Sequence, residues 1–346
     1  MSVPLACFAA EAPRQIFILW REESMYNAGF DIGGTKCAVL LADADDSQVR
    51  FVFREEIPTR GTWKEILDAL CSLFKQKCAE YSIPPDALAG AGISCGGPLD
   101  CEKGIICSPP NLPGWDAVPV CDYLQEKLGV AAALMNDADA GAVAEWRYGA
   151  GRGAKNMIFL TFGTGLGAGL ILGGKLYCGT NGMAGEIGHV RLEKSGPVGY
   201  GKKGSCEGFC SGGGLRQIAR RYAEKAFREG KSVSFCENEA VLGNVDAKKV
   251  VRCAETGAED AKQILAECGR NFGRTLAILV DILNPEVIVG GSIFLRAYRF
   301  LYPYTMETLR QEAIARSVDA CRVVPSQLQE KIGDYAAIVA SPLIRK

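Results

Sequence analysis

Residues 158–191 combine a glycine-dense turn with a carboxylate and the only histidine of the chain. An apolar run at 158–162 leads into Gly163-Thr164-Gly165-Leu166-Gly167-Ala168-Gly169, and Glu186 and His189 follow. Glycine lets a backbone approach a ligand closely and aim its N–H groups at anionic oxygens. We therefore expect a phosphate cradle in this stretch, with a polar site for a polyol beside it.

A second glycine turn lies near the start of the chain, in the run Asp31-Ile32-Gly33-Gly34-Thr35-Lys36. Two matched turns, one in each half, indicate two similar domains that hold the phosphates of one nucleotide from two sides. Asp31 is expected to reach Mg²⁺ through water, because Mg²⁺ keeps much of its hydration shell. Thr35 and Thr164 offer hydroxyl donors. Either turn alone would also fit a plain tight hairpin.

Strand-like sequence follows both turns, and this separates them from other glycine-rich phosphate sites. In Rossmann and P-loop folds the glycine turn opens a helix. For that reason we exclude a dinucleotide site at 163–168, which reads G-x-G-x-x-A. Residues 196–203 read G-x-x-x-x-G-K-K, but Lys203 stands where a P-loop needs Ser or Thr, and no strand precedes the run.

Asn136 and Asp137 stand at the end of a predicted strand at 130–135, just before a predicted helix at 140–148. A carboxylate there can accept the proton of an attacking hydroxyl. Aspartate also suits a helix N-cap. Of Asp137 and Asp139, one can therefore cap the helix while the other catalyses.

A set of hydrogen-bond acceptors and donors lies in loops rich in glycine or proline, and this set suits sugar hydroxyls. Its members besides Asp137 are Asn111, Glu186, His189 and Glu207. A lone histidine is more often structural than functional. The neighbouring carboxylate and glycines make contact with a ligand an equally good interpretation here.

The remaining pattern is that of an α/β protein of 346 residues, long enough for two domains. Alternation and apolar runs predict strands at 26–31, 37–41, 49–53, 88–94, 286–289 and 322–324. Helical spacing predicts helices at 62–81 with Thr62 as N-cap, 118–128, 258–283, 298–316 with a break near Pro303, and 334–343.

Charge and cysteine content exclude several classes of protein. A net charge of -1 and a pI of about 6.1 give no footprint for nucleic acid or a membrane surface. No apolar run approaches the roughly 20 residues of a transmembrane helix. The 15 cysteines are scattered and odd in number, which is typical of a reduced, cytoplasmic protein rather than a secreted disulfide framework.

Taken together, these stretches resemble the ROK sugar kinases, including glucokinases, of the actin-like ATPase superfamily. The similar pieces are FDIGGTK, GISCGGPLD, PPNLPGW, MNDADA, FGTGLGAGLI, GEIGH and VIVGG, from about Tyr26 onward. The resemblance implies an α/β fold of two actin-like (ribonuclease H-like) domains around a nucleotide and sugar cleft. The small domain would comprise 26–134 with helix 333–346, the large one 135–332, and residues 1–25 would form a leader outside the fold.

The resemblance also implies phosphoryl transfer from ATP, with Mg²⁺, to a hexose hydroxyl, usually on C6. Asp137 would be the base. The implied sugar ligands are Asn111, Asn136, Asp137, Glu186, His189 and Glu207, and the implied ATP-binding residues are Asp31, Gly33, Gly34, Thr35, Lys36, Thr164, Gly165, Gly290 and Gly291. Glucose or an N-acetylhexosamine is the expected substrate, and relatives commonly form homodimers. The competing hypothesis is a sugar-binding sensor without turnover.

Two departures from the family pattern matter. ROK kinases usually carry a zinc loop of the form C-x-C-G-x-x-G-C-x-E, and here Val198, Tyr200 and Ser205 replace its three cysteines. We therefore expect no zinc, although Cys206, Cys210 and His189 leave a different metal site open. ROK repressors carry a DNA-binding domain before the kinase-like fold, and the 25 leading residues, with only Arg14 and Arg21 as basic residues, are too short for one.

Overall fold

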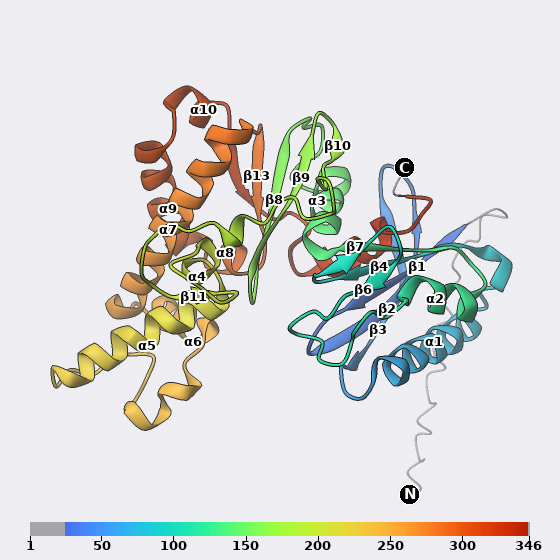
Figure 1. Cartoon of the computed structure of the whole chain (residues 1–346), viewed down its shortest axis with the longest axis horizontal. Helices are drawn as coiled ribbons and strands as arrows, with labels where there is room; N and C mark the ends of the chain where they lie inside the picture. The colour runs from blue at the N-terminus through green and yellow to red at the C-terminus, as the bar shows by residue number, and fades with distance from the viewer. Residues whose placement is uncertain (1–24, 345–346) are drawn as a thin grey trace, which may run out of the picture.

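The computed structural model describes residues 25–344, so the predicted leader lies, except for Met25, outside the described residues. Two five-stranded sheets lie in separate lobes, with α3 (Asp137–Tyr148) between them (Figure 1). The first sheet is ordered β3-β2-β1-β4-β7. Its strands are β1 (Tyr26–Ile32), β2 (Lys36–Ala44), β3 (Val49–Pro58), β4 (Leu88–Cys95) and β7 (Ala132–Asn136).

The second sheet repeats this topology in the order β10-β9-β8-β13-β14. Its strands are β8 (Met157–Phe162), β9 (Leu166–Leu172), β10 (Lys175–Leu176), β13 (Val287–Gly290) and β14 (Arg322–Pro325). In both sheets a hairpin-connected antiparallel meander is continued by two parallel strands. The two predicted strand–glycine turn–strand units are thus confirmed as corresponding parts of two similar sheets.

Helices cover both sheets, and two small hairpins complete the described chain. In addition to α3, the α-helices are α1 (Trp63–Glu80), α2 (Val120–Leu128), α4 (Cys206–Phe209), α5 (Gly212–Arg228), α6 (Ala247–Glu255), α7 (Glu259–Leu283), α8 (Ile293–Arg296), α9 (Tyr298–Glu312), α10 (Ala315–Asp319) and α11 (Ile332–Val339). The hairpins pair β5 (Leu99–Asp100) with β6 (Ile105–Ile106), and β11 (Val198–Gly199) with β12 (Lys202–Lys203). No helix within residues 25–344 is both long and apolar enough to cross a membrane.

Several predicted element boundaries are confirmed and others are wrong. Thr62 caps α1 through a complete capping box with Glu65. The predicted break near Pro303 is wrong, because α9 runs through this proline and ends at Glu312. At this proline α9 packs closely against α7, because a Cβ on Gly273 would lie only 2.5 Å from the carbonyl oxygen of Thr305, and this contact favours the helix despite the N–H that proline lacks.

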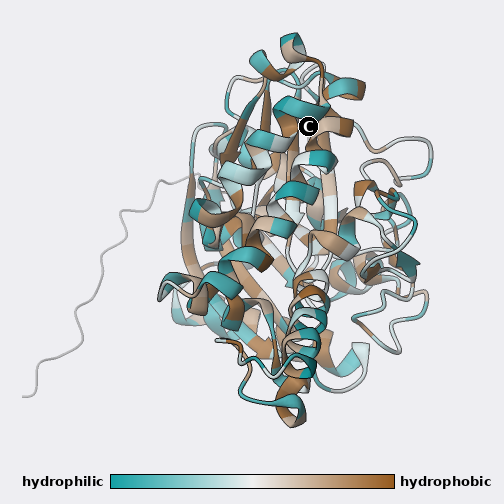
Figure 2. Cartoon of the chain, turned by 90° about the vertical axis from the view of Figure 1, so that its left-hand side faces the viewer, coloured by the Kyte–Doolittle hydropathy of each residue, from teal (hydrophilic) through white to brown (hydrophobic). Residues whose placement is uncertain are grey.

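Three apolar clusters form the core. One fills the first lobe under α1 and α2, and one fills the second lobe between its sheet and helices α4 to α9. The third joins the sheets through α3 and α11, and it includes Met135, Phe159 and Ile338. Figure 2 shows hydrophilic residues on the outward turns of the helices and hydrophobic residues on the strands behind them. The division of the chain into domains at 134 and 332 stays a prediction.

Candidate active site

Asp31 lies near the end of the central strand β1, between Ala38 on β2 and Ser94 on β4. Burial, followed by the negative charges of Asp137 and Asp334, raises the pKa of its carboxyl to about 6. The fold therefore brings Asp31 and Asp137 within electrostatic reach. A crowded carboxylate of this kind is a suitable partner for Mg²⁺, which prefers oxygen ligands and would relieve the repulsion.

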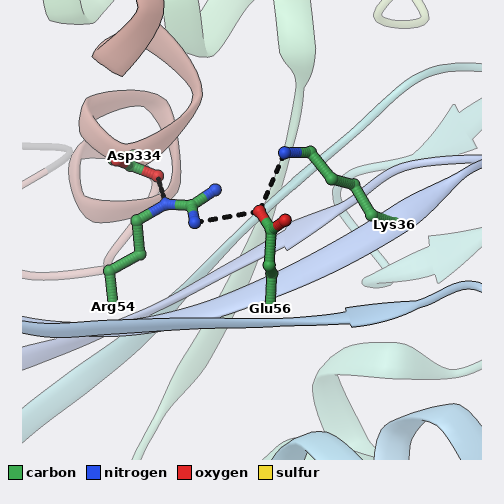
Figure 3. Close-up of polar contacts among 4 residues, drawn as sticks. All are labelled: Lys36, Arg54, Glu56 and Asp334. Carbon is green, nitrogen blue, oxygen red and sulfur yellow. Dashed lines mark hydrogen bonds and ion pairs between the residues drawn. The ribbon is translucent and has the colours of Figure 1, made fainter.

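The residues flanking the first glycine turn (33–36) form a chain of ion pairs (Figure 3). The Lys36 ammonium and the Arg54 guanidinium both donate to the Glu56 carboxylate, at 2.8 and 3.0 Å. Arg54 also donates to Asp334 at the start of α11, at 2.6 Å. Lys36, predicted to bind phosphate, therefore points at Glu56 on β3. Sequence reasoning missed Arg54 and Asp334, which are 280 residues apart.

Asn111 lies beside this first turn. A Cβ on Gly34 would come within 2.4 Å of the Asn111 carbonyl oxygen, so the proline loop packs directly on the glycine. Gly33 is packed against the Lys36 carbonyl, and Thr35 is exposed. The close backbone approach gives a structural reason for glycine at position 34, whatever else the turn binds.

The second glycine turn is shorter than predicted, because β9 already begins at Leu166. Its three residues, 163–165, are closed by a hydrogen bond from the Gly163 N–H to the Gly165 carbonyl, 3.0 Å. The start of α5 supports it, with the Gly212 N–H donating to the Gly163 carbonyl at 2.8 Å. Thr164 is exposed at the tip. The turn therefore presents a hydroxyl and backbone donors to solvent.

Asn136 and Asp137 form the junction of β7 and α3. The side-chain oxygen of Asn136 accepts from the Ala138 N–H at 3.0 Å, so Asn136 is the N-cap. The predicted capping role of Asp137 or Asp139 is wrong, since the residue before them has the extended backbone that a cap requires. The helix also begins three residues earlier than predicted, at Asp137.

The Asp137 side chain is exposed, yet the surrounding protein partly desolvates its carboxyl, and this desolvation raises the carboxyl pKa. Its own N–H and that of Ala138 partly oppose the shift. Gly96 is close by, with a Cβ position 3.9 Å from Asp137 Oδ2. Asp139, in contrast, is buried at 7% exposure. Of the two aspartates, Asp137 is the one open to a ligand.

Glu186 and His189, from one loop, come together with Glu207 of α4. Desolvation raises the pKa of the Glu186 carboxyl. His189 lowers this pKa, and the negative charges of Glu207 and Asp137 raise it. The Glu207 carboxylate accepts from the Leu166 N–H at 3.1 Å, which ties it to the second glycine turn. Glu186 is thus within electrostatic reach of His189, Glu207 and Asp137, whereas the contacts of Asn111 are with the first turn.

Gly290 and Gly291 are buried at the end of β13. A Cβ on Gly290 would lie 2.3 Å from the Phe294 ring, and one on Gly291 would lie 3.1 Å from the Phe159 ring. Close packing of α8 on Gly290 and of β8 on Gly291 therefore accounts for both glycines. Their predicted contact with adenosine stays a prediction.

The loop that replaces the zinc site is closed by hydrogen bonds. Ser205 caps α4 by accepting from the Gly208 N–H at 3.1 Å, and the Cys206 N–H donates to the Val190 carbonyl at 2.8 Å. Cys206 and Cys210 are buried in the apolar core, whereas His189 is exposed. Residues 25–344 contain no group of three His, Cys, Asp or Glu side chains that could hold a metal ion. The absence of zinc stays a prediction.

Comparisons with known proteins agree with this arrangement. The chain is 29% identical to a glucokinase of Thermotoga maritima, over 89% of this chain and 95% of that protein. It is 27% identical to a xylose repressor of Caldicellulosiruptor bescii, over 81% of this chain and 70% of the repressor. A ROK hexokinase structure from Thermus thermophilus superposes with a TM-score of 0.73 at 28% identity, covering 92% of this chain and 98% of that one.

These similarities establish the actin-like α/β fold that the resemblance implied. They also connect the chain to kinases and to a repressor, so membership of the family does not by itself fix an activity. The ROK family model matches residues 27–340, nearly the whole described chain. The protein is therefore a member of the ROK family.

Proposed function

We propose that this protein transfers a phosphoryl group from ATP to a hexose hydroxyl, most readily the one on C6. The observation that carries the proposal is the position of Asp137. This solvent-exposed carboxylate interacts electrostatically with Asp31 at the first turn and with Glu186 in the loop that carries Glu186 and His189, here called the sugar loop. A base between a phosphate site and a polyol site is what phosphoryl transfer to a sugar requires.

In the proposed reaction, the hexose oxygen attacks the γ-phosphorus while its proton passes to Asp137. The bond from the γ-phosphorus to the bridging oxygen breaks, and ADP leaves with that oxygen. A raised carboxyl pKa makes Asp137 a better proton acceptor than an ordinary aspartate. The two glycine turns would hold the phosphates, and Asp31 would hold Mg²⁺, which would supply positive charge to neutralise the phosphate oxygens.

The sugar is proposed to lie against Glu186, His189 and Glu207, whose charges meet near Asp137. Asn136 keeps its side-chain NH₂ for a sugar oxygen, because only its carbonyl oxygen is used in the cap. Glucose is the leading candidate, in keeping with the similarity to a glucokinase. An N-acetylhexosamine is the second. Homodimer formation is part of the proposal and is checked by light scattering on the purified protein.

The proposal is tested with Asp137→Asn. Loss of general-base help should lower kcat by about 10²–10⁴-fold, while glucose affinity, measured by calorimetry, stays within a few-fold of wild type. The matched control is Asp122→Asn, an exposed aspartate in the first turn of α2, which should keep full activity. Near-normal kcat in Asp137→Asn would show that another group is the base.

The alternative function is sugar sensing without turnover, which the similarity to a xylose repressor favours. The ion pair that draws Lys36 toward Glu56 also favours it. A hexose panel distinguishes the two functions. ATP consumption with any hexose supports the kinase, and sugar-induced thermal stabilisation without ATP consumption supports the sensor.

A further inference from the structure

Residues 196–203, whose G-x-x-x-x-G-K-K pattern was excluded as a P-loop, form the hairpin β11–β12. Val198 pairs with Lys203 and Gly199 pairs with Lys202. Tyr200 and Gly201 make the turn, both with positive φ, 42° and 75°. The side chain of Gln217 on α5 accepts from the Val198 N–H at 2.9 Å and donates to its carbonyl at 2.8 Å. The hairpin is thus fixed to the body of the protein by hydrogen bonds.

A recess beside this hairpin is lined mainly by basic side chains. Its lining consists of His189, Arg191, Lys194, Tyr200, Gly201, Lys202 and Lys203, with no carboxylate among them. The Lys202 ammonium donates to the His189 carbonyl at 2.7 Å, and the Arg191 guanidinium donates to the Lys203 carbonyl at 2.7 Å. Two of the cations are therefore held in place through neutral partners, and each keeps further N–H donors.

The nearest acidic side chain along the chain is directed elsewhere. Glu193 pairs with Arg274 on α7 at 2.8 Å, and both line a neighbouring recess that also has Arg191 in its lining. Glu186, in the same loop as His189, is within electrostatic reach of it. Within residues 25–344, none of the four cations of the hairpin recess forms an ion pair with a carboxylate, although sixteen such pairs occur elsewhere in that range.

Four like charges that form no ion pair with a carboxylate repel one another and attract anions, even in a protein with a net charge of -1. An Arg fork with Lys ammonium groups is a good match for phosphate oxygens. We infer that the hairpin recess binds a phosphate-bearing anion. Because Lys202 holds the backbone of His189, we also infer that this anion changes sugar affinity. The second step rests on the proposed function, and the first does not.

Calorimetry on the full chain tests the binding step, with tripolyphosphate and glucose 6-phosphate as separate probes. The double variant Lys202→Gln/Lys203→Gln should bind at least one probe about tenfold more weakly for each lysine removed. Lys175→Gln, an exposed lysine on β10, is the control for loss of charge and should bind as wild type does. Added NaCl should weaken the lysine-dependent binding.

Anions at the glycine turns would bind the wild type and the double variant alike, so only lysine-dependent binding counts. Loss with glucose 6-phosphate identifies a sugar phosphate as the ligand, and loss with tripolyphosphate alone identifies a phosphate chain. Equal affinities in wild type and double variant for both probes overturn the inference. Equal losses in Lys175→Gln and the double variant also overturn it, because general charge would then explain the effect.

Coupling to the sugar site is measured as glucose affinity with and without the probe that binds. The wild type should show a change in glucose affinity of several-fold, and the double variant should show none. If the wild type binds the anion with unchanged glucose affinity, the coupling is wrong. If no sugar of the hexose panel binds under any condition, the proposed function fails while the anion site stands.

Discussion

The two glycine turns occupy the same place in two sheets of identical strand order, yet their surroundings differ. The first turn (33–36) lies among charges: Asp31, the ion pairs of Lys36 and Arg54, and Asp334. The second turn (163–165) has an exposed threonine, the start of α5, and one carboxylate, Glu207, bound to the Leu166 N–H. One supersecondary unit has thus acquired two environments.

This difference suggests a division of labour within the proposed nucleotide site. Crowded carboxylates suit a cation, and free backbone donors with a hydroxyl suit phosphate oxygens. The first turn would therefore position the metal, and the second would hold phosphate and connect to the sugar loop through Glu207. Sequence similarity between the turns hides this asymmetry, because it arises from residues on α11, β3 and α4.

The largest expected effect separates the two turns by activity. Asp31→Asn should lower kcat by about 10²–10³-fold, the loss typical for removing one electrostatic group from a reaction centre. Thr164→Val, which replaces a neutral hydroxyl with a methyl group of similar size, should lower kcat by about tenfold. Steady-state kinetics at saturating glucose and ATP measure both. Similar losses in the two variants would contradict the division of labour.

A pH effect on stability should also distinguish the first turn from the second. Asp31 has a pKa of about 6 in the folded protein against an ordinary value of 3.8. The folded state therefore binds the carboxyl proton of Asp31 more tightly than the unfolded state does. The free energy of unfolding should fall as pH rises from 3.8 to about 6 and then level off. The shift corresponds to up to roughly 3 kcal/mol.

Urea unfolding of wild type and Asp31→Asn at pH 3.5 and 7.5 measures this contribution. The variant should be the more stable protein at pH 7.5, with the difference absent at pH 3.5. A gain in stability together with a loss of activity would mark a group kept for function at a cost to the fold. Equal stability of the two proteins at pH 7.5 would show that the carboxylate is not penalised.

The sequence predicted the fold well where pattern is local. Both strand–turn–strand units and the Thr62 cap follow from short-range apolar spacing and capping chemistry. The helix starting at Asp137 was predicted to start later, because Asn136 and Asp137 are adjacent and both suit a cap. Their backbone angles decide which of the two residues caps the helix, and these angles cannot be read from the sequence. At Pro303 a general rule about helices was overridden by tertiary packing against α7.

The candidate site was predictable as a set of residue types and less so as a geometry. Asp137, Glu186, His189 and Glu207 stand out because carboxylates and a lone histidine among glycines are conspicuous, and their charges do meet. Arg54 and Asp334 carry no local signal, because their pairing depends on how α11 returns to β3. Nor does spacing reveal that Lys36 is paired with Glu56.

Steric differences give the next comparison, in which alanine replaces one glycine of each turn. At Gly34 a Cβ would meet the backbone oxygen of Asn111, which cannot move freely, so Gly34→Ala should destabilise the fold by about 1–3 kcal/mol. At Gly165 it would lie 2.6 Å from the end of the Glu207 side chain, which can rotate. Gly165→Ala should therefore raise the KM for glucose while leaving stability nearly unchanged.

Urea unfolding and glucose kinetics are measured on both variants. Gly243→Ala serves as the control, because a Cβ there meets nothing within 4 Å. A Gly165→Ala protein that unfolds as easily as Gly34→Ala, with an unchanged KM, would show that Glu207 is rigid and has no contact with the sugar.

The smallest expected effect concerns Lys36, whose ammonium lies 2.8 Å from Glu56 in an exposed ion pair. If Lys36 binds phosphate, it must leave this partner, so Glu56 competes with ATP for the ammonium. Glu56→Gln should then lower the KM for ATP by about two- to fivefold, a factor that fits an exposed pair, and Lys36→Gln should raise it. An unchanged KM for ATP in Lys36→Gln would show that Lys36 serves the ion pairs of the first turn and never reaches the nucleotide, leaving Asp31 as the charge that distinguishes this turn from the second.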